Sequence, residues 1–429
     1  MNIINGDCLE ELKKLEDNSV DAVITDPPYG LSNTKPQQVA DVLKAWVTGD
    51  TVSVPAKRGG FMGKDWDSFV PPPAVWEECI RVLKPGGHMA VFAGARTQDL
   101  MGLSIRLAGF EIRDTLGWVY GSGFPKSQNI ARQLDKTLGE DVPIGKSFNT
   151  AGGGDRESEF ANNGRSEAHK QWSPMSDAAK QWDGWGTALK PAIEPIILAR
   201  KPLDGTVASN VLAHGVGGLN IDACRVGTTV ETWPKTRMYG GNPSEVEFTK
   251  TSGDAVSAQP TGEAPAGRFP ANVLLDEHAA KEMDKQSGNV KGVIGMKKVS
   301  GGHNFNIGEH TPQKFNKTSG QIKDSGGASR FFPVFKYQAK APKRERPVIE
   351  REDGTKIQHP TVKPVALMEW LVSLIVPPGG VVLDPFAGSG TTLQAALNKG
   401  FTPIGIEQDA DYIKLIEKRL EETCKTPKS

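Results

Sequence analysis

The chain has 429 residues, 37% of them hydrophobic, and its 51 Lys and Arg balance its 51 Asp and Glu. This length allows one large domain or two of ordinary size, and the composition excludes a chain that is disordered throughout. A formal net charge of zero argues against nonspecific coating of nucleic acid, although one face of the protein can still be basic.

The four cysteines are widely scattered and form no Cys-x-x-Cys pair. We therefore expect neither a disulfide framework nor a zinc site, and no other metal. Asp7 and Glu10 lie where a signal peptide would need an apolar run, and no stretch approaches the roughly 20 apolar residues of a membrane span. These features predict a cytoplasmic protein without a membrane partner.

Strands and helices alternate over the first 120 residues. The expected strands are at 2–5, 20–25, 88–93 and 111–120. The expected helices are at 9–15, 74–83 and 97–108, the second of them ended by Lys84-Pro85-Gly86-Gly87. This alternation predicts an α/β fold with a mostly parallel sheet.

The middle of the chain is different, because residues 145–330 hold more than half of the 48 glycines and show weak periodicity. We expect loop-rich structure with some ordered β-hairpins there. One exception is the apolar run Glu194–Ala199, a strand that should return to the sheet.

Regular alternation resumes near the C-terminus, so one α/β domain is split by a long insertion. The expected elements are a helix at 364–376, a strand at 381–384, a helix at 391–399, a strand at 402–406 and a helix at 409–421. The expected parts of the chain are a catalytic half (1–120), a loop-rich insertion with the return strand (121–200), a target-recognition insertion (201–343) and a cofactor-binding half (344–429).

The first chemical motif is Asp26-Pro27-Pro28-Tyr29, directly after the strand at 20–25. Proline has no N–H and a fixed φ, so two prolines make a stiff turn whose carbonyls are not committed to a ladder. Such a turn can aim a carbonyl oxygen and the Asp26 carboxylate at the two N–H groups of an exocyclic base amine, which returns the delocalised lone pair to the nitrogen. Tyr29 offers a flat face for stacking, a contact worth ~1–3 kcal/mol. The structural alternative is a strand-terminating turn with a surface tyrosine.

The second motif follows the strand at 381–384, where Phe386-Ala387-Gly388-Ser389-Gly390 leads into a helix. Strand, glycine turn and helix form the layout of a nucleotide-binding site, although the spacing is neither that of a dinucleotide site nor that of a P-loop. Glu407 ends the next strand, where an acid can hold both ribose hydroxyls. The alternatives are a solvated Glu407 and a Phe386 that packs under the helix.

Together and in this order, the motifs resemble S-adenosylmethionine-dependent amino-methyltransferases of DNA, in their circularly permuted β group. The segment His359-Pro360-Thr361-Val362-Lys363-Pro364 is similar to the one that precedes the cofactor motif there, and parts of the middle are similar to phage and prophage methylases. The resemblance implies a Rossmann-like fold with a mostly parallel seven-stranded sheet and S-adenosyl-L-methionine as cofactor. It assigns catalysis to Asp26, Pro27, Pro28 and Tyr29. It assigns cofactor binding to Asp7, His359, Thr361, Lys363, Asp384, Phe386, Gly388, Ser389, Gly390, Thr391 and Glu407.

The two motifs imply a particular arrangement of their strands. The strands before Asp26 and Asp384 should lie side by side at the switch point of the sheet, although the two residues are near opposite ends of the chain. Methyl donor and target amine would then meet at adjoining strand ends.

A base inside a duplex cannot reach such a pocket, so we expect double-stranded DNA as the partner, with the target base flipped out. Residues 281–344 carry many more Lys and Arg than Asp and Glu and are the best electrostatic candidates for contacting it. The expected DNA-binding residues are Lys297, Lys298, Arg330, Lys340, Lys343 and Arg344. The alternative is a solvated insertion without a nucleic-acid partner.

The sequence therefore predicts a site-specific DNA methyltransferase of a bacterial or phage-infected cell. Adenine N6 is favoured over cytosine N4, because the resemblance of Asp rather than Ser before Pro-Pro-Tyr points that way. Rival interpretations are methylation of RNA or protein, and a non-catalytic DNA-binding or cofactor-sensing protein. The resemblance also leaves open a homodimer and a cognate restriction endonuclease.

Overall fold

The computed structural model describes residues 2–32, 34–55, 67–121, 123, 127–140, 172–227, 236–238, 258–260, 267–293, 321–335, 345–351 and 353–425. Its contacts divide the chain into two units, of which the larger joins Met1–Gly121 to Ile193–Ser429 and the smaller is Ser122–Ala192.

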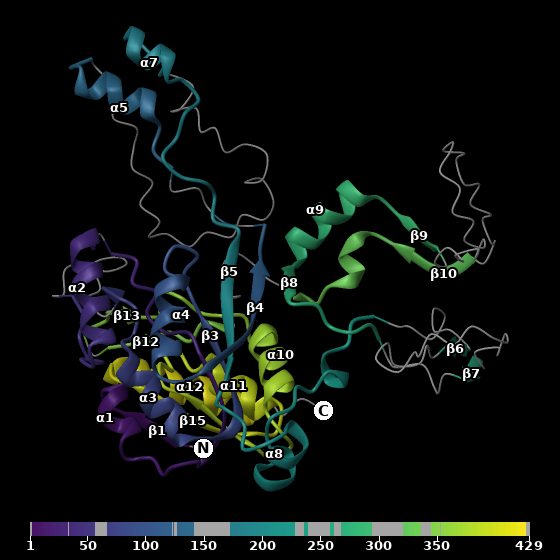
Figure 1. Ribbon diagram of the computed structural model, residues 1–429. Coiled ribbons are helices and arrows are strands. Elements are labelled where there is room, and N and C mark those ends of the chain that lie inside the picture. The colour runs from purple at the N-terminus through teal and green to yellow at the C-terminus, as the bar shows by residue number, and fades with distance from the viewer. Residues whose placement is uncertain are drawn as a thin grey trace, which may run out of the picture. The chain divides into compact units, whose positions relative to one another are not determined.

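A nine-stranded sheet forms the larger unit, with the order β1-β15-β14-β2-β3-β5-β4-β8-β11 (Figure 1). Its strands are β1 (Asn2–Asn5), β15 (Thr402–Glu407), β14 (Val381–Asp384), β2 (Val20–Thr25), β3 (Leu83–Phe92), β5 (Ile193–Arg200), β4 (Glu111–Val119), β8 (Val273–Asp276) and β11 (Val334–Phe335). Neighbours pair in parallel, except that β5 is antiparallel to both β3 and β4. The mostly parallel, Rossmann-like fold is confirmed, with β8 and β11 added to the seven strands expected.

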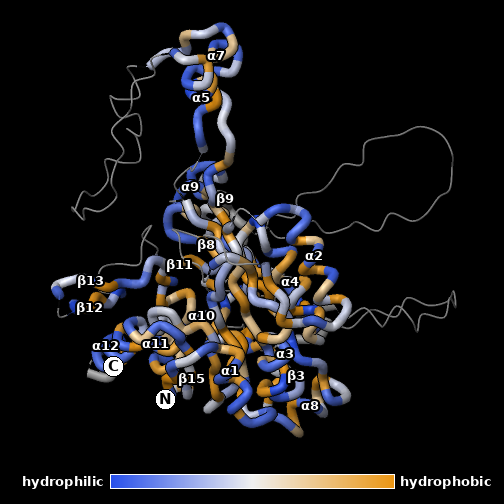
Figure 2. The backbone as a smooth tube through the Cα atoms, turned by 90° about the vertical axis from the view of Figure 1, so that its left-hand side faces the viewer, coloured by the Kyte–Doolittle hydropathy of each residue, from blue (hydrophilic) through white to orange (hydrophobic). Residues whose placement is uncertain are grey.

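Helices cover both faces of this sheet. They are α1 (Cys8–Leu12), α2 (Pro36–Val47), α3 (Pro73–Val82), α4 (Gln98–Leu107), α8 (Val207–His214), α10 (Val365–Ile375), α11 (Thr391–Asn398) and α12 (Ala410–Lys425). Successive residues of β2 point to opposite faces: Val23 packs in the core with α3 and α4, whereas Ala22 and Ile24 pack in the core with α10 and α11. Burial on both faces explains why β2 is buried at every position and why its centre, Ala22-Val23-Ile24, is apolar without alternation. Figure 2 shows hydrophobic residues gathered along the strands.

The start of β3 corrects one expectation. Lys84-Pro85-Gly86-Gly87 ends α3 as a terminator should, but β3 already begins at Leu83 and includes this segment. The pairing with β2 shifts register between Val20 and Ala22, and Gly86 has a φ of 76°. A glycine accepts this left-handed conformation without strain, so the strand continues past the irregularity.

The middle of the chain contains the expected hairpins and also elements that weak periodicity concealed. β6 (Thr236–Met238) pairs with β7 (Ala258–Pro260), and β9 (Val290–Val293) pairs with β10 (Gln321–Gly326), both antiparallel. The helix α9 (Glu277–Ser287) follows β8 and is capped by Asp276, and the 3₁₀ turns η4 (Asp222–Cys224) and η5 (Ala328–Phe331) are also found here. β12 (Ile349–Glu350) pairs with β13 (Lys356–Ile357) at the start of the expected cofactor-binding half. The assignment of 201–343 to target recognition stays a prediction.

The smaller unit contains α5 (Ile130–Thr137) and α7 (Asp177–Gln181). The buried Asp135 joins them, because its carboxylate accepts from the backbone N–H groups of Met175 and Ser176 at 2.9 and 3.0 Å. Asn129 caps α5 and bridges to Gly186 in an isolated pair. This unit is thus held by backbone and capping contacts of its own.

No helix in the described ranges is long and apolar enough to cross a membrane. Among the same residues, no group of three or more His, Cys, Asp or Glu side chains is arranged to hold a metal ion.

Candidate active site

The two motifs from opposite ends of the chain open at the same edge of the sheet. β2 and β14 are neighbours in parallel register, with Val382 opposite Ala22 and Leu383 opposite Val23. The last residue of β2, Thr25, donates its hydroxyl to Asp384 Oδ1 at 2.7 Å. The predicted adjacency of the two strands is therefore confirmed.

The Asp26–Tyr29 turn is held from outside by two side chains. The buried Asp67 accepts at Oδ1 from the backbone N–H groups of Tyr29 and Gly30 at 2.7 and 3.1 Å, and Thr97 donates its hydroxyl to the Tyr29 carbonyl at 2.6 Å. Gly30 has a φ of 67°, and a Cβ there would lie 2.8 Å from the Val70 nitrogen. Hydrogen bonds fix the backbone groups of the turn, and the close approach of Gly30 to Val70 fixes its path, so the turn is rigid.

Four polar side chains meet on this turn. The Tyr29 hydroxyl donates to Asp26 Oδ1 at 2.7 Å, and the Lys363 ammonium lies 3.0 Å from Asp26 Oδ2, 2.9 Å from Glu194 Oε2 and 2.8 Å from Tyr29 Oη. Burial raises the pKa of Tyr29 well above its usual value, so the phenol stays neutral. Burial opposes the charge of Lys363, but Asp26 and Glu194 outweigh it and raise the pKa of the ammonium. We call Asp26, Tyr29, Glu194 and Lys363 the amine cluster.

The glycine turn between β14 and α11 is shaped by left-handed backbone. Gly388 and Gly390 have φ values of 53° and 77°, and a Cβ on Gly390 would lie 3.0 Å from Ile416 Cγ2. Glu407, at the end of β15, accepts from the Gly388 N–H at 2.8 Å and from the Asp409 N–H at 2.9 Å. Burial raises the pKa of Glu407 to about 7.

Asp384 connects the two turns, because it accepts hydrogen bonds from Thr25 before the Asp26 turn and from the Phe386 N–H of the glycine turn. It is only 2% exposed, and burial raises its pKa to about 6 although Thr392, Thr25 and the Phe386 N–H donate hydrogen bonds to it. Ser389 and Thr391 are buried beside it at the start of α11. Phe386 packs against the core, with its ring 6.3 Å from that of Trp76.

The remaining expected cofactor residues surround the glycine turn. Asp7 Oδ1 accepts from the N–H groups of Leu9 and Glu10 and so caps α1, while the Gly6 N–H donates to the Glu407 carbonyl at 3.0 Å. His359 Nδ1 hydrogen-bonds the Thr361 carbonyl, and a Cβ on Gly388 would lie 3.0 Å from His359 Nε2. The structure thus places Asp7 and His359 next to Glu407 and Gly388, whereas Lys363 reaches the amine cluster.

Of the six expected DNA-binding residues, Arg330 lies in the described part of the chain. Its guanidinium donates to the Gly327 carbonyl at 2.6 Å and lies 4.3 Å from the centre of the Phe331 ring. The others, outside the described residues, are Lys297, Lys298, Lys340, Lys343 and Arg344.

Sequence reasoning missed three residues of the site. Glu194 could have been found, because it begins the strand foreseen at 194–199; if that strand runs antiparallel, its first residue lies at the carboxyl edge of the parallel strands. Asp67 and Thr97 carry no such signal, since neither lies in a motif or at the end of a predicted strand.

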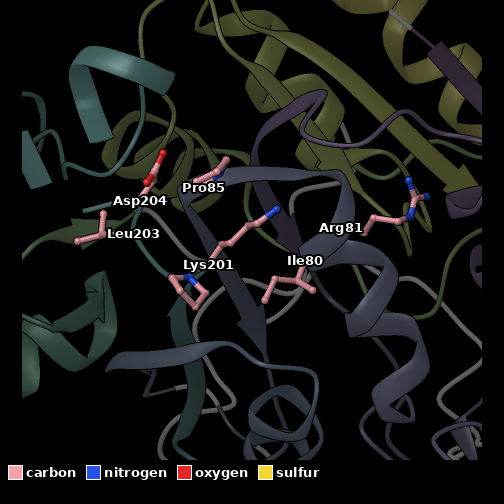
Figure 3. A pocket seen from close by; sticks show the side chains of 7 residues that line it. Ile80, Arg81, Pro85, Lys201, Leu203 and Asp204 are labelled. Carbon is pink, nitrogen blue, oxygen red and sulfur yellow. The ribbon is translucent and has the colours of Figure 1, made fainter. Parts of the chain in front are cut away.

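A hollow lies at the amino edge of the sheet (Figure 3). It is lined by Ile80, Arg81, Pro85, Lys201, Pro202, Leu203 and Asp204. Its lysine is already engaged, because Lys201 Nζ donates to the Leu83 carbonyl at 2.7 Å and to Asn18 Oδ1 at 2.8 Å. This hollow is separate from the edge where Asp26 and Asp384 meet.

Comparison with known families agrees with this geometry. A family model of DNA methylases of the N6/N4 type matches residues 20–418, so the chain belongs to that family.

Individual relatives match less of the chain. Type II methyltransferase M.HindIII of Haemophilus influenzae is 26% identical over 239 residues, which are 51% of this chain and 64% of that protein. DNA adenine methyltransferase YhdJ of Escherichia coli is 48% identical over 63 residues, 15% of this chain and 21% of that protein. The chain thus spans less than two thirds of the length of either relative. Among solved structures, the PvuII DNA methyltransferase (cytosine-N4-specific) is 14% identical, with 99% of this chain and 89% of that one covered and a TM-score of 0.39.

Proposed function

We propose that this protein is a site-specific DNA methyltransferase that moves a methyl group from S-adenosyl-L-methionine to an exocyclic amine of a flipped-out base. The observation that carries the proposal is the meeting of the Asp26 turn and the glycine turn at adjoining ends of β2 and β14. One turn offers acceptors to an amine, and the other offers backbone and a carboxyl to a nucleoside.

The residues of the glycine turn fit this cofactor. Glu407 uses both carboxyl oxygens to fix the turn and the start of α12, and each oxygen keeps a lone pair for a ribose hydroxyl. Gly388 and Gly390 leave the backbone bare, and the Asp7 turn lies beside Glu407 for the adenine. His359, which hydrogen-bonds the Thr361 carbonyl, lies over Gly388 for the methionine end. When bound, S-adenosylmethionine supplies an electrophilic methyl group on a sulfonium, which is already a good leaving group.

The amine cluster performs the protein's part of the reaction. Asp26 and the Pro27 carbonyl accept the two hydrogens of the amine, so the nitrogen becomes more tetrahedral and its lone pair points away from the ring. Tyr29 stacks on the base, and its neutral hydroxyl stays bonded to Asp26. Methylation leaves an extra proton on nitrogen, and a carboxylate oxygen of Asp26 can hold it. Orientation supplies most of the acceleration.

Adenine N6 is the target we propose. It is supported by the Asp that opens the Asp-Pro-Pro-Tyr motif and by the adenine named for the relative YhdJ. We further propose double-stranded DNA as the partner, residues 201–343 as its reader and the cytoplasm as the compartment. A homodimer and a cognate restriction endonuclease belong to the same proposal; sedimentation and copurification test them.

Labelled S-adenosylmethionine tests the proposal when it is offered with DNA, RNA or protein in separate reactions. We expect label in DNA, and single-molecule sequencing should place it at adenine N6 in one sequence context. Label at cytosine N4 would correct the base, whereas label in RNA or protein, or in none of the three, would overturn the proposed function. The Asp26→Asn variant serves as the inactive control.

A further inference from the structure

The Lys363 ammonium occupies the place that the proposed reaction needs. Both oxygens of Asp26 already have donors, since Oδ1 accepts from Tyr29 and Oδ2 lies 3.0 Å from Lys363 Nζ. A target amine must also donate to Asp26. Each oxygen can accept a second hydrogen bond, but the amine and the ammonium compete for the negative charge of one carboxylate.

We propose that Glu194 is a positioning residue that keeps the Lys363 ammonium while Asp26 exchanges it for the target amine. Glu194 Oε2 is 2.9 Å from Lys363 Nζ and 3.3 Å from Tyr29 Oη. The ion pair to Glu194 is thus already made before Asp26 is released. This inference rests on the proposed amine methylation.

Lys363 cannot simply move into solvent when Asp26 lets go. The residue is 9% exposed, and its ammonium lies 4.8 and 5.2 Å from the ring centres of Phe92 and Tyr29. Pro364, the N-cap residue of α10, follows it directly. A buried cation without a carboxylate is strongly destabilising. Among the described residues, Glu194 is the second carboxylate paired with this lysine.

The charges of the cluster give Glu194 a second effect. Two carboxylates and one ammonium leave one negative charge, and the amine becomes positive as it is methylated. Neutralising Glu194 would leave that developing charge without compensation and would tie Lys363 more tightly to Asp26. Both effects slow methyl transfer itself and leave cofactor binding alone.

Other titratable groups face the amine cluster and contribute to the pH dependence of its reaction. His359 interacts with Asp26 and Lys363, and Asp384 interacts with Asp26. Removing the lysine leaves Asp26 and Glu194 to repel each other without a cation between them. The pH–rate profile of Lys363→Met should therefore differ from that of the parent.

Single-turnover methylation of DNA by the full chain tests the inference with Glu194→Gln, Glu194→Asp, Lys363→Met and the Glu194→Gln/Lys363→Met double variant. We expect Glu194→Gln to slow transfer about 10- to 100-fold, with a cofactor Kd within about twofold of the parent. Glu194→Asp keeps the charge and should recover part of the rate. The matched control is Glu111→Gln, which removes a carboxylate paired at 2.6 Å with Arg200 at the other end of β5 and should leave the rate unchanged.

The double variant tests whether Glu194 acts by holding Lys363. If Glu194 acts by holding Lys363, removing the lysine makes it dispensable, so the double variant should be faster than Glu194→Gln alone. A double variant that is no faster, or a Glu194→Gln enzyme with the parent rate, overturns the inference. Failure of the proposed function looks different, because the parent protein itself would then transfer no label to DNA.

Discussion

The two turns that meet at the edge of the sheet treat their carboxyl groups in opposite ways. At the Asp26 turn, two carboxylates share one buried ammonium, that of Lys363. At the glycine turn, Asp384 and Glu407 have hydrogen-bond donors instead, and burial raises their pKa values to about 6 and about 7. The first turn balances its carboxylates with a buried cation, whereas the carboxyl groups of the second titrate near neutral pH.

The difference follows from what each turn must bind. A neutral amine that becomes positive is stabilised by carboxylates beside it, and the ammonium balances those carboxylates in a buried place. Ribose hydroxyls need only an acceptor, so a carboxyl that ionises on binding is sufficient. The amine turn should therefore control rate, and the glycine turn should control affinity and its pH dependence.

The largest effect is expected from Asp26. Asp26→Ala removes the acceptor that orients the amine and leaves Lys363 with Glu194, so methyl transfer should fall by about 1,000-fold or more. Cofactor affinity should change little, because the glycine turn is untouched. Single-turnover rates and calorimetric titration with S-adenosylmethionine measure the two quantities. An Asp26→Ala enzyme with the parent rate would remove the distinction between the two turns.

A substitution in the glycine turn should instead weaken cofactor binding. Gly390→Ala places a Cβ at a φ of 77° and within 3.0 Å of Ile416, which should lower the free energy of unfolding by about 2–4 kcal/mol and weaken cofactor binding. Gly379 is the matched control, since its φ is 73° but a Cβ there meets nothing within 4 Å. Gly379→Ala should cost about 1–2 kcal/mol and leave cofactor affinity unchanged. Equal losses in the two variants, measured by urea unfolding, would show that the packing against Ile416 is irrelevant.

A pH series tests the titrating carboxyl directly. Glu407 has a pKa of about 7 in the free protein, and hydroxyl donors bind the ionised form better, so cofactor affinity should rise about five- to tenfold from pH 6 to pH 8. Stability of the free protein should move the other way. The folded state binds the extra proton between pH 4.5 and about 7, so the stabilisation from this group is lost as pH rises through that window.

Glu407→Gln separates this effect from titration of the ligand itself. The variant should bind more weakly at pH 8 and should lose most of the difference between pH 6 and pH 8. Calorimetric titration at both values measures it, and a variant that keeps the full pH dependence assigns the titration to another group.

The strands that carry this site were predicted well from the sequence, because they are almost completely buried and end at distinctive turns. β2 is buried at every position and β14 at three of four, and each ends at a turn that contains proline or glycine. Both the strands and the residues at which they end could therefore be predicted. β8 and β11 were missed because they have only four and two residues and lie in a glycine-rich region where periodicity is weak.

The partners of the motifs were harder to predict than the motifs. Lys363 was assigned to the cofactor because its segment resembles the family segment that precedes the glycine turn, but a resemblance in sequence does not say which of two adjacent turns a side chain reaches. Glu194 needed the direction of β5, which only the pairing with β3 and β4 reveals. Asp67 acts through two backbone N–H groups, and a sequence carries no pattern for that.

The smallest effect is expected at Asp7, which the resemblance assigns to the cofactor and the structure shows as the cap of α1. Asp7→Ala should lower the free energy of unfolding by about 1 kcal/mol, because two N–H groups of the first helical turn lose their acceptor. Asp7→Asn keeps a capping side chain and should restore most of that stability. If Asp7 also contacts the cofactor through its charge, Asp7→Asn will bind S-adenosylmethionine more weakly than the parent despite a restored helix. Parent-like affinity in Asp7→Asn would leave the capping of α1 as its function and reduce the glycine turn's set of binding carboxyls to Asp384 and Glu407.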